Sequence, residues 1–177
     1  MNTKKTITQK AKNIKLLACD IDGVLTRGEI IVLSNGEEIK IWNVKDGMGY
    51  NELFKTFPRI ETAWISGRKS LQNEKRAKTL KIDYLMQDCT NKKEALKKIL
   101  DKSGIDVGEV AYIGDDVIDI PVLKAVGFSA CPIDACEDVK KTVNYISSFK
   151  GGEGAVREVI EIVMQSKGEW KKALDRH

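Results

Sequence analysis

The stretch LLACDIDGVLTRG, residues 16–28, places two carboxylates at the end of an apolar run. The run LLAC predicts a buried strand, and Asp20 and Asp22 follow it directly. Side chains two positions apart lie on the same face of an extended chain, so the pattern predicts two negative charges close together. Such a pair is costly without a cation. The alternative is a strand that ends in an Asp-Gly turn at Asp22 and Gly23.

Short apolar runs alternate with segments of helical periodicity along the rest of the chain. Strands are expected in IKLLACD, IETAWISG, DYLMQ, EVAYIGD, GFSACP and VNYISS. Helices are expected in KKEALKKILDKSG, which ends at a Gly suited to a helix terminus, and in GAVREVIEIVMQ. This alternation predicts an α/β fold with a doubly wound parallel sheet, whose ligands bind at the carboxyl ends of the strands.

One segment, GEIIVLSNGEEIKIWNV, interrupts the alternation. Its Asn35-Gly36 pair predicts a β-hairpin over about residues 29–44 that projects from the main sheet. The length of 177 residues predicts a single domain, 1–177, with a core over about 13–166. The two ends are expected to be flexible tails, and no cap domain is expected.

Composition excludes several classes of function. The net charge of +4 is small and its lysines are scattered among glutamates, so we expect no nucleic-acid partner. No apolar stretch approaches the roughly 20 residues that span a membrane, and the basic N-terminal segment lacks the apolar centre of a signal peptide. We therefore expect a cytoplasmic protein. Its four cysteines form no CxxC pair, and they are expected to be apolar filler in a reducing compartment.

The histidine count narrows the possible chemistry further. His177, the last residue, is the only histidine. A Ser-His-Asp triad, a Cys-His pair and a histidine-ligated metal are therefore not expected. Any catalysis would use carboxylates, lysines, hydroxyls and a hard cation.

Three further polar groups stand where expected strands or helices end or begin. Ser66 follows a strand in WISGR, Lys92 starts a helix in TNKKEA, and Asp115, Asp116 and Asp119 follow a strand in YIGDDVIDIP. Each has an ordinary alternative: a Ser-Gly turn, a surface lysine, and helix capping by the aspartates. Taken together at one sheet edge, they supply a nucleophile, an acid, a hydroxyl donor, a cation and a metal clamp.

The ordered series DIDGVLT, ISGR, Lys92 and GDDVID resembles the four motifs of the haloacid dehalogenase superfamily of phosphatases, over about residues 15–165. Within that superfamily NVKDG, SGRK, GDDVIDIPVL and GGEGAVREV resemble the 3-deoxy-D-manno-octulosonate 8-phosphate (KDO 8-phosphate) phosphatases of lipopolysaccharide biosynthesis. One departure is Glu153, because many of these enzymes have a basic residue at that place.

The resemblance implies a role for each motif residue. Asp20 would attack phosphorus to form an aspartyl phosphate, and Asp22 would act as acid and then as base. Ser66 and Lys92 would bind phosphoryl oxygens.

The resemblance also implies Mg²⁺ as cofactor. The metal would lie between the Asp20 carboxylate, the Asp22 carbonyl and Asp115, with Asp116 or Asp119 supporting this shell.

The expected substrate is a small anionic sugar phosphate, KDO 8-phosphate, bound also by Lys45, Gly67 and Arg68. The alternatives are an N-acylneuraminate or KDN 9-phosphate phosphatase and a non-catalytic assembly domain of the same fold. The resemblance implies a homotetramer whose hairpins cover neighbouring active sites.

Overall fold

The computed structural model describes residues 2–53 and 55–177, and side chains from residue 7 onward except at 54. Six parallel strands form one sheet in the order β5-β4-β1-β6-β7-β8. Their bounds are β1 (Leu16–Cys19), β4 (Glu61–Ile65), β5 (Tyr84–Met86), β6 (Val110–Ile113), β7 (Phe128–Cys131) and β8 (Tyr145–Ile146). Every residue of β1, β6 and β7 is buried, as continuous apolar runs in a covered parallel sheet require. The predicted α/β fold is confirmed.

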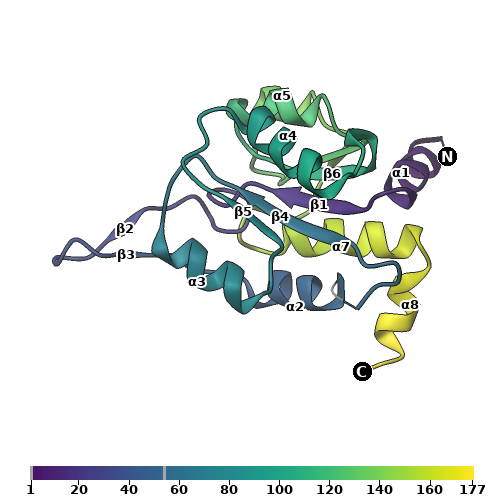
Figure 1. Cartoon of the computed structure of the whole chain (residues 1–177), viewed down its shortest axis with the longest axis horizontal. Coiled ribbons are helices and arrows are strands. Elements are labelled where there is room, and N and C mark those ends of the chain that lie inside the picture. Colours follow the sequence, from purple (N-terminus) through teal and green to yellow (C-terminus); the bar gives the residue numbers. More distant parts are fainter. Residues whose placement is uncertain (1, 54) are drawn as a thin grey trace.

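Helices cover both faces of the sheet, which lies between them in Figure 1. One face packs against α1 (Asn2–Lys12), α2 (Val44–Leu53), α3 (Leu71–Thr79), α7 (Ala155–Ser166) and α8 (Glu169–Leu174). The other packs against α4 (Lys92–Ser103), α5 (Ile120–Leu123) and α6 (Glu137–Lys140). Short 3₁₀ turns, η1 (Val107–Glu109) and η2 (Val117–Asp119), precede β6 and α5. None of the described helices has the length and apolar character needed to cross a bilayer.

The order of the strands determines where a ligand can bind. From β1 the chain continues to β4 and β5 on one side, and β6, β7 and β8 lie on the other. The chain order therefore reverses at β1, and at such a switch point the loops after adjacent strands part and leave a crevice. The segments after β1, β4 and β6 hold the predicted DIDG, SGR and GDDVID motifs.

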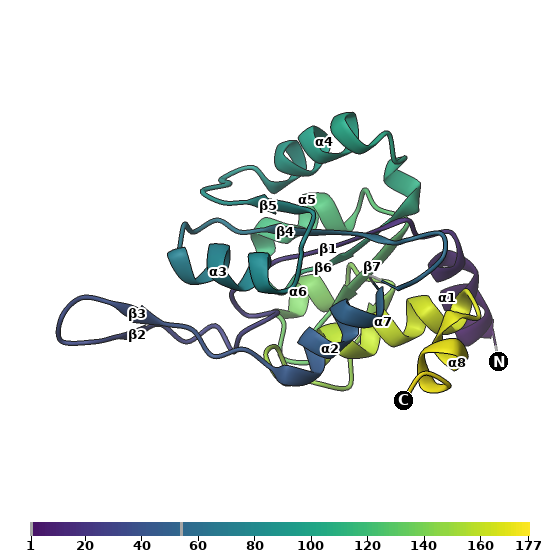
Figure 2. The ribbon, with the colours of Figure 1, turned by 60° about the horizontal axis from the view of Figure 1, so that its bottom comes forward.

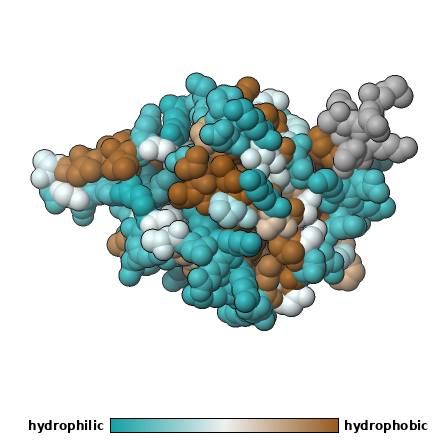
Figure 3. Space-filling model, turned by 90° about the horizontal axis from the view of Figure 1, so that it is seen from above, coloured by the Kyte–Doolittle hydropathy of each residue, from teal (hydrophilic) through white to brown (hydrophobic). Residues whose placement is uncertain are grey.

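The predicted hairpin is present, and it extends well beyond the body of the molecule (Figures 1 and 2). Its strands β2 (Ile31–Val32) and β3 (Glu38–Ile39) are antiparallel and only two residues long. Gly36 has φ +83°, the left-handed conformation that an Asn-Gly hairpin turn requires. Its exposed apolar side chains appear as the brown arm at the left of Figure 3; they are Ile30, Ile31, Val32, Leu33, Ile39 and Ile41.

The two ends, which were expected to be flexible tails, form helices that pack on the body of the described chain. Helix α1 packs on α7, with Ile7 against the core and Ala11 fully buried. At the other end α8 packs on α7, and Arg176 and His177 both contact the buried carboxylate of Glu52. A buried carboxylate needs such partners, so the last residues are held in place and the packed body extends beyond residues 13–166.

A side chain from α2 completes the amino end of α7. Helix α7 begins after Gly154, which has no side chain to cap it, and the Arg157 backbone N–H donates instead to Asp46 Oδ1 at 2.8 Å. Asp46 is buried, and burial raises its pKa to about 6, although the Arg157 N–H and the charges of Arg157 and Arg76 oppose that rise. The expected motifs NVKDG and GGEGAVREV therefore meet in one helix cap.

We expect Asp46 to make stability fall as the pH rises. Between pH values of about 4 and 6 the folded carboxyl keeps its proton while the unfolded one has lost it, so ionisation costs the folded state up to about 3 kcal/mol. Urea denaturation of wild type and Asp46→Asn from pH 4 to 7.5 measures this. The variant should gain stability relative to wild type up to about pH 6 and no further. A constant difference across that range would contradict the prediction.

Candidate active site

Strand β1 ends at Cys19, one residue before the first carboxylate. The chain then turns tightly, with Leu25 N–H and Thr26 N–H both donating to the Ile21 carbonyl. Asp20 and Asp22 therefore do not lie on an extended strand, and they have different cations as partners. The positions of the two carboxylates are therefore set by this turn and by their two lysine partners, and not by strand alternation.

Lys92 pairs with two carboxylates from other parts of the chain. Its Nζ lies 2.6 Å from Asp20 Oδ2 and 2.8 Å from Asp119 Oδ1. Lys92 is the first residue of α4, and the Asn91 side chain caps that helix by accepting from Glu94 N–H. The cap fixes the start of α4, so Lys92 is directed inward, where its side chain is almost fully buried.

The carboxylate of Asp119 is held on both oxygens. Tyr112 Oη donates to Oδ1 at 2.7 Å, while the N–H groups of Asp115 and Asp116 donate to Oδ2. Asp119 is completely buried, so these donors and Lys92 replace the water that it has lost. Asp116 itself is exposed and caps η2 by accepting from Val117 N–H, which matches the capping alternative for that residue.

The structure brings together a third carboxylate, that of Asp115. Ligand oxygens of Asp20, Asp115 and Asp119 all lie within 4.8 Å of one another. Gly23 makes this possible, since a Cβ there would lie 2.1 Å from Asp115 Oδ2 and its φ of +90° suits glycine. Asp115 Oδ1 is buried and has no hydrogen-bond partner among the described residues.

The charges of this cluster do not balance. Three carboxylates share one lysine, and burial, followed by the charges of Asp20 and Asp119, raises the pKa of Asp115 to about 8. Burial also raises the pKa of Asp20 to about 6, against the opposing charge of Lys92. Burial lowers the pKa of Lys92, but the two carboxylates outweigh it and the net shift is upward. Hard oxygen donors with excess negative charge and one unpartnered oxygen fit a divalent cation such as Mg²⁺.

Ser66 and Arg68 lie in the loop after β4, next to β1 in the sheet. Ser66 is buried, and its Oγ accepts from Arg68 N–H. Among the described residues its hydroxyl proton has no acceptor, so the hydroxyl can donate to a ligand. Gly67 is exposed, and a Cβ there would come no closer to a neighbour than 3.8 Å. The Arg68 guanidinium pairs with Glu38 of the hairpin at 2.7 Å.

Two residues that contact the aspartates of the site, Lys40 and Tyr112, are not among the site residues predicted from the sequence. Lys40, just after β3, donates from Nζ to Asp22 Oδ1 at 2.6 Å. Tyr112 donates to Asp119 from within β6. A signal for Lys40 exists in the sequence, because it alternates with Ile39 and Ile41 in the hairpin. Lys45 is different: its side chain is exposed on α2, and no contact with the carboxylate cluster occurs in the described part of the chain.

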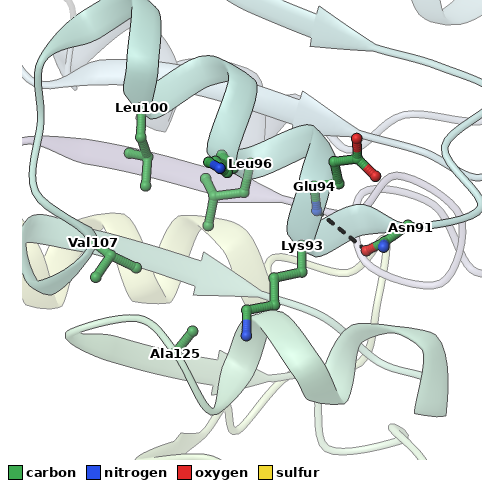
Figure 4. Close-up of a pocket in the computed structure, with 8 residues that line it drawn as sticks. Asn91, Lys93, Glu94, Leu96, Leu100, Val107 and Ala125 are labelled. Carbon is green, nitrogen blue, oxygen red and sulfur yellow. Dashed lines mark hydrogen bonds between the residues drawn. The ribbon is translucent and has the colours of Figure 1, made fainter.

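Several surface hollows adjoin α4, and two of them lie at its amino-terminal half. The more apolar, about 380 Å³, opens between α4, η1 and the end of α5, and none of the motif carboxylates lines it (Figure 4). The other, about 450 Å³, includes Lys92 and is lined also by Thr90, Asn91, Lys93, Ile118 and Pro121. Of these two hollows in the described chain, the second adjoins the charged cluster through Lys92, so chemistry and not apolar character locates the site.

Comparison with known proteins agrees with this geometry. A model of the haloacid dehalogenase-like hydrolases matches residues 29–160. The KDO 8-phosphate phosphatase of Escherichia coli strain K12 is 41% identical over 167 residues, which cover 94% of this chain and 88% of that protein.

Solved structures give the same result. The KDO 8-phosphate phosphatase from Moraxella catarrhalis, in complex with magnesium ion, phosphate ion and KDO, superposes with a TM-score of 0.93 and 38% identity over 96% of this chain and 97% of that one. A cobalt-bound phosphatase from Haemophilus influenzae gives a TM-score of 0.86 and 37% identity over 90% and 92% of the two chains. The chain therefore belongs to the haloacid dehalogenase-like hydrolases and, within them, to the KDO 8-phosphate phosphatase family.

Proposed function

We propose that this protein is a Mg²⁺-dependent phosphatase that hydrolyses KDO 8-phosphate to KDO and phosphate. The observation that carries the proposal is the cluster of Asp20, Asp115 and Asp119 around Lys92 at the switch point of the sheet. The Moraxella relative, whose solved structure holds magnesium, phosphate and KDO together, supports both the cofactor and the substrate.

Asp20 is proposed as the nucleophile. Its Oδ1 accepts from Ile21 N–H and its Oδ2 from Lys92, so the carboxylate is held in one orientation before substrate arrives. Attack on phosphorus would break the bond to the sugar oxygen and leave an aspartyl phosphate. Lys92 and Ser66 would bind the phosphoryl oxygens. Asp20, Asp115 and the Asp22 carbonyl would hold Mg²⁺, with Asp119 behind them; when bound, the ion would offset the negative charge of the site.

Asp22 is proposed as the acid and base. The sugar leaves as an alkoxide, a strong base, so a positioned proton donor accelerates that step by about 10²–10⁴-fold. The same carboxylate would then take a proton from the water that hydrolyses the aspartyl phosphate. Asp22 suits both steps because one oxygen, Oδ2, is buried and without a partner among the described residues.

Arg68 and Lys45 are the proposed contacts to the substrate carboxylate, with Gly67 beside them. Arg68 follows Ser66 by two residues and is already placed by Glu38. The alternative substrate, an N-acylneuraminate or KDN 9-phosphate, also carries a carboxylate and a phosphate. The non-catalytic alternative is disfavoured, because the nucleophile and its lysine are both present and paired.

We further propose a single domain that assembles as a homotetramer in the cytoplasm. The described residues form no cap over the site, and the hairpin exposes six apolar side chains on an arm that a lone subunit leaves uncovered. The four cysteines are free thiols, which suits a reducing compartment.

Phosphate release from purified protein tests the function. With Mg²⁺, KDO 8-phosphate should give a higher kcat/KM than N-acylneuraminate 9-phosphate, and EDTA should abolish turnover. Asp20→Asn, which replaces the nucleophile by an amide, should lose at least about 10³-fold in kcat. Equal kcat/KM for both sugars would remove the substrate assignment. An active Asp20→Asn variant would remove covalent catalysis by that residue.

Lys92 should be needed for stability as well as for catalysis. Lys92→Met leaves Asp20 and Asp119 buried without their cation, so the free energy of unfolding should fall by about 3–5 kcal/mol at pH 7 without metal. The neighbouring Lys93→Met, at an exposed position, serves as control and should change stability by no more than about 0.5 kcal/mol. Urea denaturation measures both. Equal decreases in the free energy of unfolding for the two variants would mean that the pairs of Lys92 with Asp20 and Asp119 do not stabilise the fold.

Light scattering after size exclusion tests the assembly. At micromolar concentration the mass should be four times that of the 19.8 kDa chain. Ile41→Asp, at a hairpin position that is 64% exposed, should lower that mass because it places charge in the subunit contact. Leu174→Asp on α8, with 60% exposure, is the matched control and should not change it. An active monomeric wild type would contradict the tetramer.

A further inference from the structure

The second arm of the hairpin has its polar and apolar side chains on unexpected faces. Glu38, Lys40 and Trp42 alternate with Ile39 and Ile41. An arm that packs on a protein core normally turns its isoleucines inward. Here Ile39 and Ile41 are exposed, while the three alternating side chains contact the body of the molecule.

Each of the three inward side chains has a specific partner. Glu38 pairs with Arg68, and its carbonyl accepts from Gln72 Nε2 at 2.5 Å. Trp42 stacks on Trp64 with ring centroids 5.6 Å apart and an interplanar angle of 11°. Between these two anchors the register of the arm is fixed, so the position of Lys40 is determined from both sides.

Lys40 contacts the group proposed as acid and base. Its Nζ lies 2.6 Å from Asp22 Oδ1, and its side chain is only 5% exposed. Burying a lysine is expensive and a salt bridge offsets that cost only partly, so stability alone is a weak reason to keep this pair. The arm exposes Ile39 and Ile41 and buries the Lys40 side chain, which indicates a functional role for the Lys40 ammonium group.

We propose that Lys40 is a positioning residue for Asp22. It binds Oδ1 and thereby fixes the rotamer of the carboxylate, which leaves Oδ2, buried and unpartnered, as the oxygen that transfers the proton. The inference rests on the proposed phosphatase function with Asp22 as its acid and base. The hairpin thus acts on chemistry within its own subunit, in addition to any contact with another copy.

The effect of losing Lys40 should depend on the leaving group. Ethyl phosphate releases a strongly basic alkoxide that needs a proton from Asp22, whereas p-nitrophenyl phosphate releases a weakly basic phenolate that does not. The parameter kcat/KM reports the steps up to loss of the leaving group. A decrease in kcat/KM that occurs with ethyl phosphate and not with p-nitrophenyl phosphate therefore measures lost proton donation by Asp22. Neither compound has the sugar or its carboxylate, so loss of sugar contacts cannot produce the difference.

The test compares Lys40→Met with wild type on both compounds in the presence of Mg²⁺. We expect kcat/KM to fall about 10- to 100-fold on ethyl phosphate, the range for a misplaced catalytic group, and less than about threefold on p-nitrophenyl phosphate. Lys15→Met is the matched control. It removes a lysine that pairs with Glu109 at 2.7 Å and directly precedes β1, at the amino-terminal end of that strand and away from the site, and it should change neither value. Equal losses on the two compounds, or none, would overturn the proposal.

Two further variants separate positioning from simple anchoring of the hairpin. In an Asp22→Asn background Lys40→Met should cause no further loss on ethyl phosphate, because the carboxylate it positions is gone; multiplying losses would overturn the proposal. Lys40→Arg keeps a cation and should retain more activity than Lys40→Met, and an Arg variant no better than Met would count against it. If wild type cleaves these simple esters but not KDO 8-phosphate, the substrate assignment fails while the Lys40 comparison remains valid.

Discussion

One buried ammonium group, that of Lys92, allows the site to exist in its present form. It is the only cation that contacts the Asp20 and Asp119 carboxylates in the described chain, and Asp115 lies within the same cluster. Without it, like charges held this close in a buried environment would protonate or separate. The cap of α4 by Asn91, the inward direction of that helix's first residue and the glycine beside Asp115 all follow from the need to assemble this cluster.

Residues from distant parts of the chain form the site. The sheet reverses at β1, so segments after three strands meet there, and α4 adds its amino end. The hairpin adds contacts to Asp22 and Arg68 from outside the sheet. Although the described residues form no cap domain, the hairpin therefore contacts side chains of the site. A short arm with its charged face turned inward supplies part of what a second domain would supply in a larger protein.

Local pattern was enough to predict the strands of the sheet and the hairpin turn at Gly36, because each depends on spacing within a few residues. Contacts that join distant segments could not be predicted in this way. The strand ends before Asp20, and the alternation of Lys40 with Ile39 and Ile41 indicates which face of the arm Lys40 lies on but not that it reaches Asp22. The packing of the two ends is also non-local, since α1 and α8 gain stability from packing on α7 and not from their own composition.

The cap that Asp46 provides to α7 has a consequence for the order in which the molecule folds. Acceptor and donor are 111 positions apart, and α7 lies near the end of the chain. During synthesis the acceptor leaves the ribosome long before the helix that needs it, so the part of the sheet face that α7 covers stays exposed while the intervening residues are made. A chain cut before residue 155 would lack α7 and would expose the apolar side chains that pack against that helix, which are the kind of surface that chaperones and proteases recognise.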